Sequence, residues 1–177
     1  MIKKRYELKE NNTGKIIPEF KTIVDVVVTE TDITFEFDCK NSQFYSAYNQ
    51  YNAPVWEGDA CEAFLCTDGK GDWYYEVEIA PNNTVFLKHM NNKGCGIFDE
   101  YEIEENFVTS EVKIEGNDYK VKFSVPLDKI GYDKNIGISI NIFRIETEGG
   151  IPEKNLFAMN PTLMPTFHNK DFLVELK

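Results

Sequence analysis

Three glutamates and a preceding tryptophan are the residues whose types and spacing suit chemistry best. Trp56 stands among turn formers in "NAPVWEGDACEAFL", and Glu62 follows six residues later inside an apolar segment. Glu76 and Glu78 alternate with other residues in "DWYYEVEIA". Carboxylates accept hydrogen bonds from hydroxyl groups, and two of them can act as general acid and base. These four residues are therefore the first candidates for a site.

The glutamates have several interpretations. They fit solvent-facing positions, because one face of an antiparallel sheet is commonly wet. If their segments pair as a hairpin, Glu62, Glu76 and Glu78 share one surface, where directly opposed like charges are destabilising. Such a surface requires donors from a ligand, an ion or Arg144. A glycosidase acid and base lie about 5 Å or about 6.5–9.5 Å apart, a distance that sequence spacing leaves open.

Other catalytic and cofactor patterns are missing from the sequence. No G-x-S-x-G occurs, and neither His89 nor His168 lies in a triad signature. The glycines of "TDGKGD" lack both the helix after a phosphate loop and the spacing of a calcium loop. No cofactor is predicted from these patterns. No C-x-x-C pair occurs either, so we predict free buried thiols at Cys39, Cys61, Cys66 and Cys95.

Aromatic residues make up 14% of the chain, and several cluster near turns. The run "NSQFYSAYNQYNAPVW" mixes tyrosines with asparagine and glutamine. Sugars present C–H faces that stack on aromatic rings, and hydroxyl groups that bond to amides and carboxylates. The run therefore favours a sugar as ligand, while general burial trends assign part of the tyrosines to the core.

Alternation of apolar and polar residues with period two dominates the chain and predicts antiparallel strands. Two hairpins are expected, in "KTIVDVVVTE" with "DITFEFDC" and in "DACEAFLC" with "DWYYEVEIA". Further strands are expected in "NTVFLKH", "FVTSEVKIEG", "YKVKFSVP", "IGISINIFRIE" and "DFLVEL". Only "PLDKIG" (Pro126–Gly131) indicates a short helix, and Glu146–Lys170 is interpreted as a structured loop. We predict a single all-β domain over residues 1–177, an antiparallel two-sheet β-sandwich of immunoglobulin-like or jelly-roll-like type with one short helix.

Alternation also assigns side chains to faces of the second hairpin. In its first strand, one face carries Cys61, Ala63 and Leu65, and the other carries Glu62, Phe64 and Cys66. In its second strand, one face carries Trp73, Tyr75, Val77 and Ile79, and the other carries Tyr74, Glu76 and Glu78. The three glutamates are thereby expected on a common face.

Charge bears on the partners of the chain. A net charge of -11 and a pI near 4.7 oppose binding to nucleic acid and to anionic membranes, which attract clustered Lys and Arg. No apolar run reaches the length of a transmembrane helix. "MIKKRYELKE" lacks the apolar stretch of a signal peptide, so we expect a cytoplasmic protein or a domain cut from a secreted one. A monomer is favoured, and the sequence leaves the oligomeric state open.

Five stretches resemble, in their order, the family 9 carbohydrate-binding modules: "VWEGDACEAFL", "DWYYEVEIAPNNTVF", "VKFSVPLDKIG", "IGISINIFRIE" and "NPTLMPTFHNKDFLVEL". The resemblance covers the chain from about Val55 to its C-terminus. It implies a non-catalytic antiparallel β-sandwich of the kind often attached to xylanases. It further implies that sugar termini are held between two aromatic rings, and that structural calcium can be bound.

The resemblance also implies roles for single positions. Trp56 corresponds to a stacking aromatic on a loop, Glu62 to an acceptor for sugar hydroxyls, and Asn141 to a binding amide. Sugar-binding members have Arg and Asn where this chain has Glu76 and Glu78, and they have a second stacking Trp that is absent here.

We therefore predict a non-catalytic domain that binds a plant-type glycan or a sugar terminus. Phe167, or else Met159, would form the wall opposite Trp56, and His168 would brace the long loop. The candidate binding residues are Trp56, Glu62, Glu76, Glu78, Asn141, Arg144, Phe167 and His168. Two alternatives remain, a small glycoside hydrolase that uses Glu62 with Glu76 or Glu78, and a sandwich interaction domain that has lost sugar binding.

Overall fold

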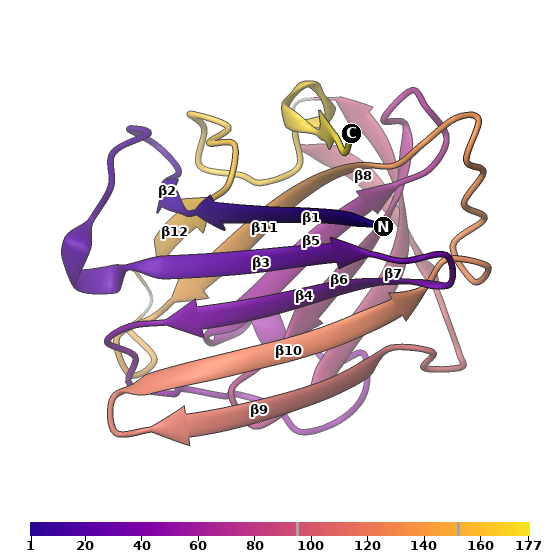
Figure 1. Ribbon diagram of the computed structural model, residues 1–177. Coiled ribbons are helices and arrows are strands. Elements are labelled where there is room, and N and C mark those ends of the chain that lie inside the picture. Colours follow the sequence, from indigo (N-terminus) through magenta and orange to yellow (C-terminus); the bar gives the residue numbers. More distant parts are fainter. Residues whose placement is uncertain (95, 152) are drawn as a thin grey trace.

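The computed structural model describes residues 1–94, 96–151 and 153–177 as two antiparallel sheets packed face to face (Figure 1). The five-stranded sheet contains, in spatial order, β1 (Ile2–Glu7), β3 (Thr22–Val28), β4 (Asp32–Cys39), β10 (Asp118–Pro126) and β9 (Thr109–Glu115). The eight-stranded sheet contains β2 (Lys9–Glu10), β12 (Asn155–Ala158), β11 (Ser139–Glu146), β5 (Ala60–Cys66), β6 (Trp73–Ile79), β7 (Val85–Gly94) and β8 (Ile97–Glu102). Its last strand, β13 (Val174–Glu175), pairs with β11. The predicted β-sandwich is confirmed.

The main core lies between the two sheets and follows the predicted alternation. Every second residue of β3 and β4 is buried there, as are Cys61, Ala63 and Leu65 of β5. Burying one such large apolar side chain contributes roughly 1.5–3 kcal/mol, so the inner faces hold the sheets together. The opposite face of β5 carries Phe64 and Cys66 into a second, smaller apolar cluster.

Both predicted hairpins are confirmed by strand pairing. β3 pairs with β4, and β5 pairs with β6 in a register that sets Glu62 directly opposite Glu78 and Phe64 opposite Glu76. Because directly opposed residues of an antiparallel pair project to the same face, all three glutamates lie on the outer face of the eight-stranded sheet. The hairpin prediction therefore placed them correctly relative to one another.

The predicted helix at Pro126–Gly131 is wrong. Pro126 ends β10, and the following residues form turns in which Tyr132 N donates to Leu127 O at 3.0 Å. The first turn of a helix fixes many dihedral angles for a single hydrogen bond, and a segment of six residues adds too few further hydrogen bonds to offset that entropic cost. The helical residues that the structure describes lie in three short 3-10 turns, η1 (Pro18–Phe20), η2 (Val55–Glu57) and η3 (Lys170–Phe172). None of the described helices is long and apolar enough to cross a membrane.

Four strands were not predicted from the sequence: β1, β2, β8 and β12. β1 and β8 are edge strands, and their sequences "IKKRYE" and "IFDEYE" carry the charges that edges commonly bear, which hide the alternation. β12 lies inside the segment interpreted as a loop. The predicted free thiols are confirmed for Cys39, Cys61 and Cys66, all buried, and Cys95 lies outside the described residues.

Candidate functional site

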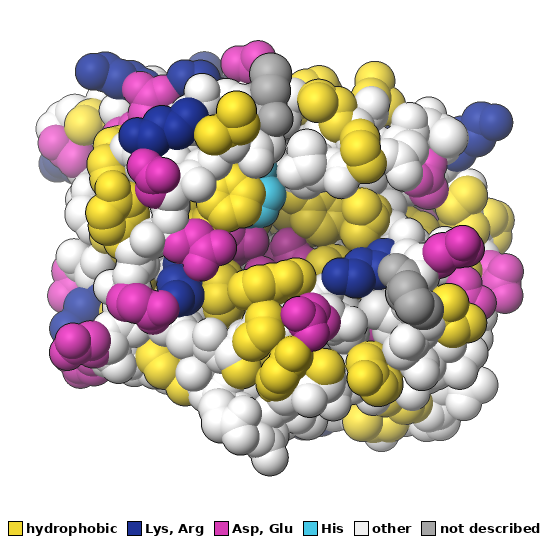
Figure 2. All heavy atoms as spheres, turned by 180° about the vertical axis from the view of Figure 1, so that it is seen from behind, with side chains coloured by type: hydrophobic (Ala, Val, Ile, Leu, Met, Phe, Trp, Pro, Cys, Tyr) yellow, Lys and Arg dark blue, Asp and Glu magenta, His cyan; other side chains and the backbone are white. Residues whose placement is uncertain are grey.

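A cavity of about 310 Å³ opens on the outer face of the eight-stranded sheet. Viewed from behind, this face is hollowed, with acidic side chains in the depth of the hollow and hydrophobic side chains and a histidine around it (Figure 2). Its lining side chains are aromatic, acidic or aliphatic for the most part: Trp56, Glu62, Glu76, Glu78, Phe86, Met90, Phe98, Glu100, Ile145, Lys154, Leu156, Pro165, Thr166, Phe167 and His168. Six of the eight predicted site residues are among them.

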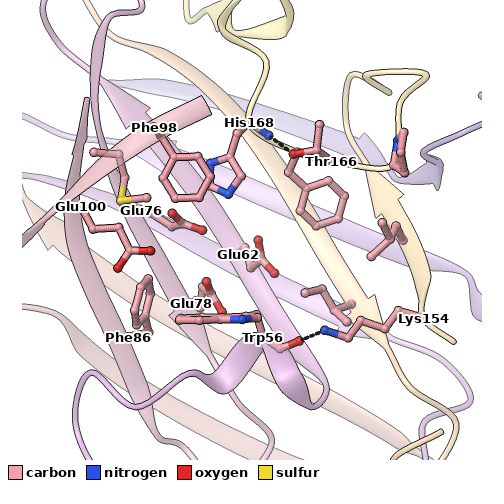
Figure 3. Close-up of a pocket in the computed structure, with 15 residues that line it drawn as sticks. Trp56, Glu62, Glu76, Glu78, Phe86, Phe98, Glu100, Lys154, Thr166 and His168 are labelled. Carbon is pink, nitrogen blue, oxygen red and sulfur yellow. Dashed lines mark hydrogen bonds between the residues drawn. The ribbon is translucent and has the colours of Figure 1, made fainter. Parts of the chain in front are cut away.

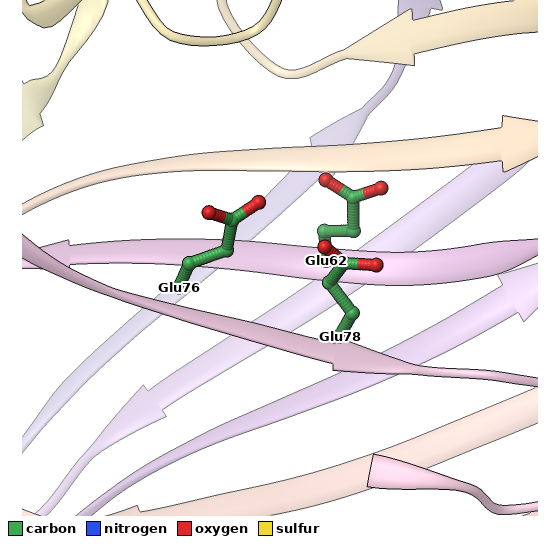
Figure 4. A group of neighbouring side chains, drawn as sticks. All are labelled: Glu62, Glu76 and Glu78. Carbon is green, nitrogen blue, oxygen red and sulfur yellow. The ribbon is translucent and has the colours of Figure 1, made fainter. Parts of the chain in front are cut away.

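The three glutamates predicted from the hairpin lie side by side in this cavity (Figure 4). Strand register explains why. Glu62 of β5 stands opposite Glu78 of β6, and Glu76 lies two residues before Glu78 on the same face. One carboxylate oxygen from each lies within 4.8 Å of the other two. Their exposed fractions are only 1%, 5% and 1% for Glu62, Glu76 and Glu78, so the solvent-facing interpretation is wrong.

Burial leaves these carboxyl groups short of partners. Glu76 and Glu78 hydrogen-bond each other. Glu62 Oε1 and Glu78 Oε2 are buried without a hydrogen-bond partner among the described residues. The nearby lysines are engaged elsewhere, because Lys88 Nζ contacts the Glu102 carboxylate and Lys154 Nζ donates to the backbone oxygen of Trp56. Unpaired buried oxygens are costly, and they mark places where a ligand could donate.

Burial and mutual repulsion make the carboxyl groups weak acids. Burial, reinforced by the charge of Glu76, raises the pKa of Glu62 well above its ordinary value. Burial raises the pKa of Glu76 to about 8, against the hydrogen bond from Glu78, which lowers it. The pKa of Glu78 is likewise raised, first by burial and then by the charges of Glu62 and Glu76. The cavity therefore favours protonation, or a bound group that supplies positive charge or hydrogen-bond donors.

Trp56 forms one side of the cavity, next to Phe86 (Figure 3). It lies in η2, half-buried, with its ring edge-on to Phe86 at 4.9 Å between centroids. Gly58 ends this turn where a Cβ would meet the backbone oxygen of Tyr45 at 2.6 Å, so a larger residue would displace the loop. The indole is therefore held on a short, closely packed turn beside the carboxylates.

Asp59 fixes the base of the same loop. Its Oδ2 accepts from Tyr45 N at 2.9 Å, and its Oδ1 accepts from Thr147 N at 2.8 Å. Asp59 is fully buried, and these bonds join the Trp56 loop to the end of β11. A carboxylate with several donors is stable when buried, in contrast to the three glutamates.

Phe98 and His168 form the side facing Trp56, with the glutamates between the two sides (Figure 3). Their rings stack at 3.9 Å, and the Tyr74 hydroxyl lies 2.6 Å from His168 Nδ1. Burial lowers the pKa of His168 to about 4, so its imidazole is neutral at pH 7. The backbone oxygen of His168 also accepts from Gly96 N at 3.0 Å, which ties the C-terminal segment to the β7–β8 hairpin.

Phe167 also lines the cavity, as predicted, but most of its ring packs against other side chains of the protein. Its ring stacks on Phe143 at 4.1 Å, and it is 7% exposed. Met159, the alternative wall residue, packs against the main core and does not line the cavity. The wall opposite Trp56 is thus built chiefly from Phe98 and His168.

Two predicted binding residues, Arg144 and Asn141, lie away from the cavity. Arg144 stands opposite Cys61, on the inner face of β11, where its guanidinium donates to Glu146 at 2.6 Å and to Thr22 Oγ1 at 2.9 Å. It is fully buried between the sheets and cannot serve the three glutamates. The prediction that it supplies donors to them is wrong.

Asn141 shares the outer face with Phe64, which it opposes in the sheet. Its side-chain amide hydrogen-bonds within the protein, because Nδ2 donates to Asn160 O at 2.8 Å and Oδ1 accepts from Asn160 N at 3.1 Å. Asn141 therefore holds the chain that follows β12, and the prediction of a ligand contact is wrong.

Sequence reasoning missed Phe86, Phe98, Glu100 and Lys154. Phe86 stands opposite Glu78 in the sheet, and Glu100 and Phe98 come from the unpredicted strand β8. No alternation of apolar and polar residues signals β8, because "IFDEYE" carries acidic residues on both of its faces. Lys154 lies just before β12 and gave no signal of its own.

Among the described residues, Glu62, Glu76 and Glu78 form the one group of side chains whose spacing suits the ligands of a metal ion. Calcium takes six to eight oxygen ligands. Apart from these glutamates, the oxygen-bearing side chains of the cavity lining are Glu100 and Thr166, and the others are mainly aromatic or aliphatic. The structural calcium implied by the resemblance stays a prediction, and Glu62, Glu76 and Glu78 with Glu100 are the side chains of this cavity that would hold it.

Comparison with known proteins supports the fold. No protein-family model and no curated protein matches the chain. Among solved structures, a Bacteroides uniformis protein proposed to bind carbohydrate is similar with a TM-score of 0.73 and 14% identity, over 97% of this chain and 84% of the other. A family 9 carbohydrate-binding module of Caldicellulosiruptor kristjanssonii in complex with glucose gives 0.67 and 12%, over 97% and 83%. A structure of a module of the same family and organism with cellotriose gives 0.68 and 13%, over 97% and 80%.

This chain has the fold of family 9 carbohydrate-binding modules. The resemblance of its sequence motifs to that family is confirmed at the level of the fold. In this chain, the cavity between Trp56 and Phe98 combines aromatic walls with unpaired carboxylate oxygens of Glu62 and Glu78.

Proposed function

We propose that the cavity binds a carbohydrate without transforming it. The observation that carries this proposal is the arrangement of unpaired carboxylate oxygens of Glu62 and Glu78 between aromatic walls. Sugar hydroxyls are donors that those oxygens lack, and the C–H faces of a sugar ring suit the flat sides of Trp56 and Phe98. A cavity of about 310 Å³ is large enough for one sugar residue, with the chain of a longer glycan outside it.

The neighbouring structures support a sugar as ligand. Two structures of family 9 modules with this fold contain glucose and cellotriose. We therefore expect a gluco-configured ring, as in plant-type glycans or at their ends, to be the kind of sugar that enters. Stacking and a few hydrogen bonds in an open cavity give affinities on the order of micromolar to millimolar.

The surroundings of the carboxyl groups argue against hydrolysis, although their oxygens, within 4.8 Å of one another, are as close as the about 5 Å of a retaining pair. A glycosidase needs two carboxyl groups that flank the scissile bond, one of them ionised. Here Glu62 and Glu78 project side by side from adjacent strands, and burial raises the pKa of both. We expect no turnover of aryl-glycosides, and turnover that disappears in Glu62→Gln would instead support the hydrolase alternative.

Titration of glycans into Trp73→Phe, followed by tryptophan fluorescence, tests the proposal. The chain has two tryptophans, and Trp73 packs against His89 and Tyr101 outside the cavity, so this variant reports on Trp56 alone. We expect saturable changes with glucose, cellobiose or xylo-oligosaccharides. Calorimetry on Trp56→Ala should then show at least about tenfold weaker binding. Absence of binding to every glycan, or equal affinity in a folded Trp56→Ala protein, would favour an interaction domain without a sugar site.

A further inference from the structure

The cavity contains more carboxyl groups than a neutral sugar would satisfy. Glu62, Glu76, Glu78 and Glu100 all line it. Sugar hydroxyls supply hydrogen bonds but no charge, so beneath a neutral ring Glu62, Glu76 and Glu78, which are 1–5% exposed, stay protonated, or carry the cost of a buried charge when ionised. A ligand that carries positive charge into the cavity removes this penalty. Charge-assisted hydrogen bonds are also roughly twice as strong as neutral ones.

The spacing of the carboxylates suits an ammonium group. Three N–H···O bonds of about 2.8 Å around a tetrahedral nitrogen place their acceptors about 4.6 Å apart. Oxygens of Glu62, Glu76 and Glu78 lie within 4.8 Å of one another. Two of the buried oxygens, Glu62 Oε1 and Glu78 Oε2, have no partner among the described residues, so acceptors are free on both β5 and β6.

The walls favour an organic cation over a metal ion. Rings of Trp56, Phe86 and Phe98 surround the carboxylates (Figure 3). Aromatic faces attract ammonium groups and pack against the carbon skeleton that carries them. A hard metal ion gains nothing from aromatic walls, since its ligands are oxygen atoms.

We propose that the cavity selects a saccharide with a free, protonated amine, such as a deacetylated hexosamine unit, whose ammonium binds among Glu62, Glu76 and Glu78. Its ring lies between Trp56 and the pair of Phe98 and His168. This inference rests on the proposed function and narrows it to one class of sugar. An N-acetylated sugar lacks the charge and is bulkier at the same position, so it is disfavoured.

Proton release accompanies binding of such a cation. The charged and titratable groups that face the glutamates come from several elements: Glu100 on β8, Lys88 on β7, Lys154 before β12, and the neutral His168. Lys88 is ion-paired with Glu102, and Lys154, which donates to the backbone oxygen of Trp56, already acts on Glu62 and Glu78 through its charge. A bound ammonium is therefore the main new positive charge near the glutamates. It lowers the pKa of these carboxyl groups and displaces their protons, whereas a neutral sugar leaves the protons in place.

Calorimetry with matched disaccharides at pH 7 and low salt tests the inference. The probes are β-1,4-linked diglucosamine, cellobiose and N,N′-diacetylchitobiose, with calcium chloride as a separate arm. We expect diglucosamine to bind at least about tenfold more tightly than cellobiose, with net proton release in buffers of different ionisation enthalpy. Glu78→Gln should bring the two affinities to within about threefold. Glu104→Gln, at an exposed carboxylate outside the cavity, should keep the wild-type ratio.

The outcomes separate this inference from the function on which it rests. Cellobiose binding as tightly as diglucosamine would overturn the inference and leave the proposed function intact. Binding of no saccharide, neutral or amine-bearing, would overturn both. Tight binding of calcium alone that blocks diglucosamine would show that the carboxylates form a metal site, which also overturns the inference.

Discussion

Because its buried carboxyl groups hold protons, the folded protein should become less stable as the pH rises above 6.5, and Glu76→Gln should reduce this effect. The ordinary pKa of this side chain is 4.5, and in the folded protein it is about 8. Between these values the folded state holds a proton that the unfolded chain has lost, so the free energy of unfolding falls as pH rises. One pKa unit corresponds to about 1.4 kcal/mol. Raising the pH from 6.5 to 8 therefore removes about 2 kcal/mol through Glu76 alone.

The pH window matters because His168 acts in the opposite direction. Burial lowers its pKa from 6.5 to about 4, so the unfolded chain binds the extra proton as pH falls through that range. Above about pH 6.5 the imidazole is neutral in both states and contributes little. Between pH 6.5 and 8 the glutamates consequently dominate, and Glu62 and Glu78, whose pKa values are raised as well, add to the loss.

Urea unfolding of the ligand-free protein at pH 6.5, 7.25 and 8, followed by tryptophan fluorescence, measures this effect. Wild type should lose stability across the series. Glu76→Gln, which keeps the shape of the protonated side chain, should lose about 2 kcal/mol less and be the more stable protein at pH 8. The exposed Glu104→Gln is the matched control and should follow wild type. A wild-type stability that is constant or rises over this window would refute the reasoning.

Three further predictions concern other parts of the structure. Arg144→Met should lower the free energy of unfolding by about 3–5 kcal/mol because Glu146 is left as an unpaired buried charge, and adding Glu146→Gln should restore part of it in denaturant titrations. Asn141→Ala should cost about 1–3 kcal/mol by leaving the backbone of Asn160 unpaired, while sugar affinity measured by calorimetry on the folded protein stays within about threefold of wild type. His168→Phe should reduce the stability lost between pH 6.5 and 4 by up to about 3 kcal/mol relative to wild type, and an unchanged acid limb would contradict the neutral imidazole.

The β5–β6 hairpin shows what the sequence could predict. Strong alternation with a turn between the two segments was enough to place Glu62, Glu76 and Glu78 on one face. Alternation says which residues share a face, but not what covers that face. The outer face of this hairpin is covered by the segment containing Phe167 and His168, which has no periodicity, so the burial of the glutamates became evident only in the structure.

The errors at Asn141 and Arg144 have a simple physical cause. The two residues are three positions apart on one strand, so they project to opposite faces and could not both contact a ligand. The alternation of side chains between the two faces of a strand could by itself have excluded one of these two residues. Which one depends on the register between β11 and β5, which sets Arg144 opposite the core residue Cys61. Register is a tertiary property that the local pattern of β11 leaves open.

The position of the ligand tests the central claim most directly. A crystal structure of the protein with a saturating saccharide, chosen from those that bind in solution, should show a sugar ring between Trp56 and Phe98. Its donors should lie within about 3 Å of Glu62 and Glu78. A saccharide bound elsewhere on the surface, with this cavity unoccupied, would contradict the assignment of the cavity as the sugar site.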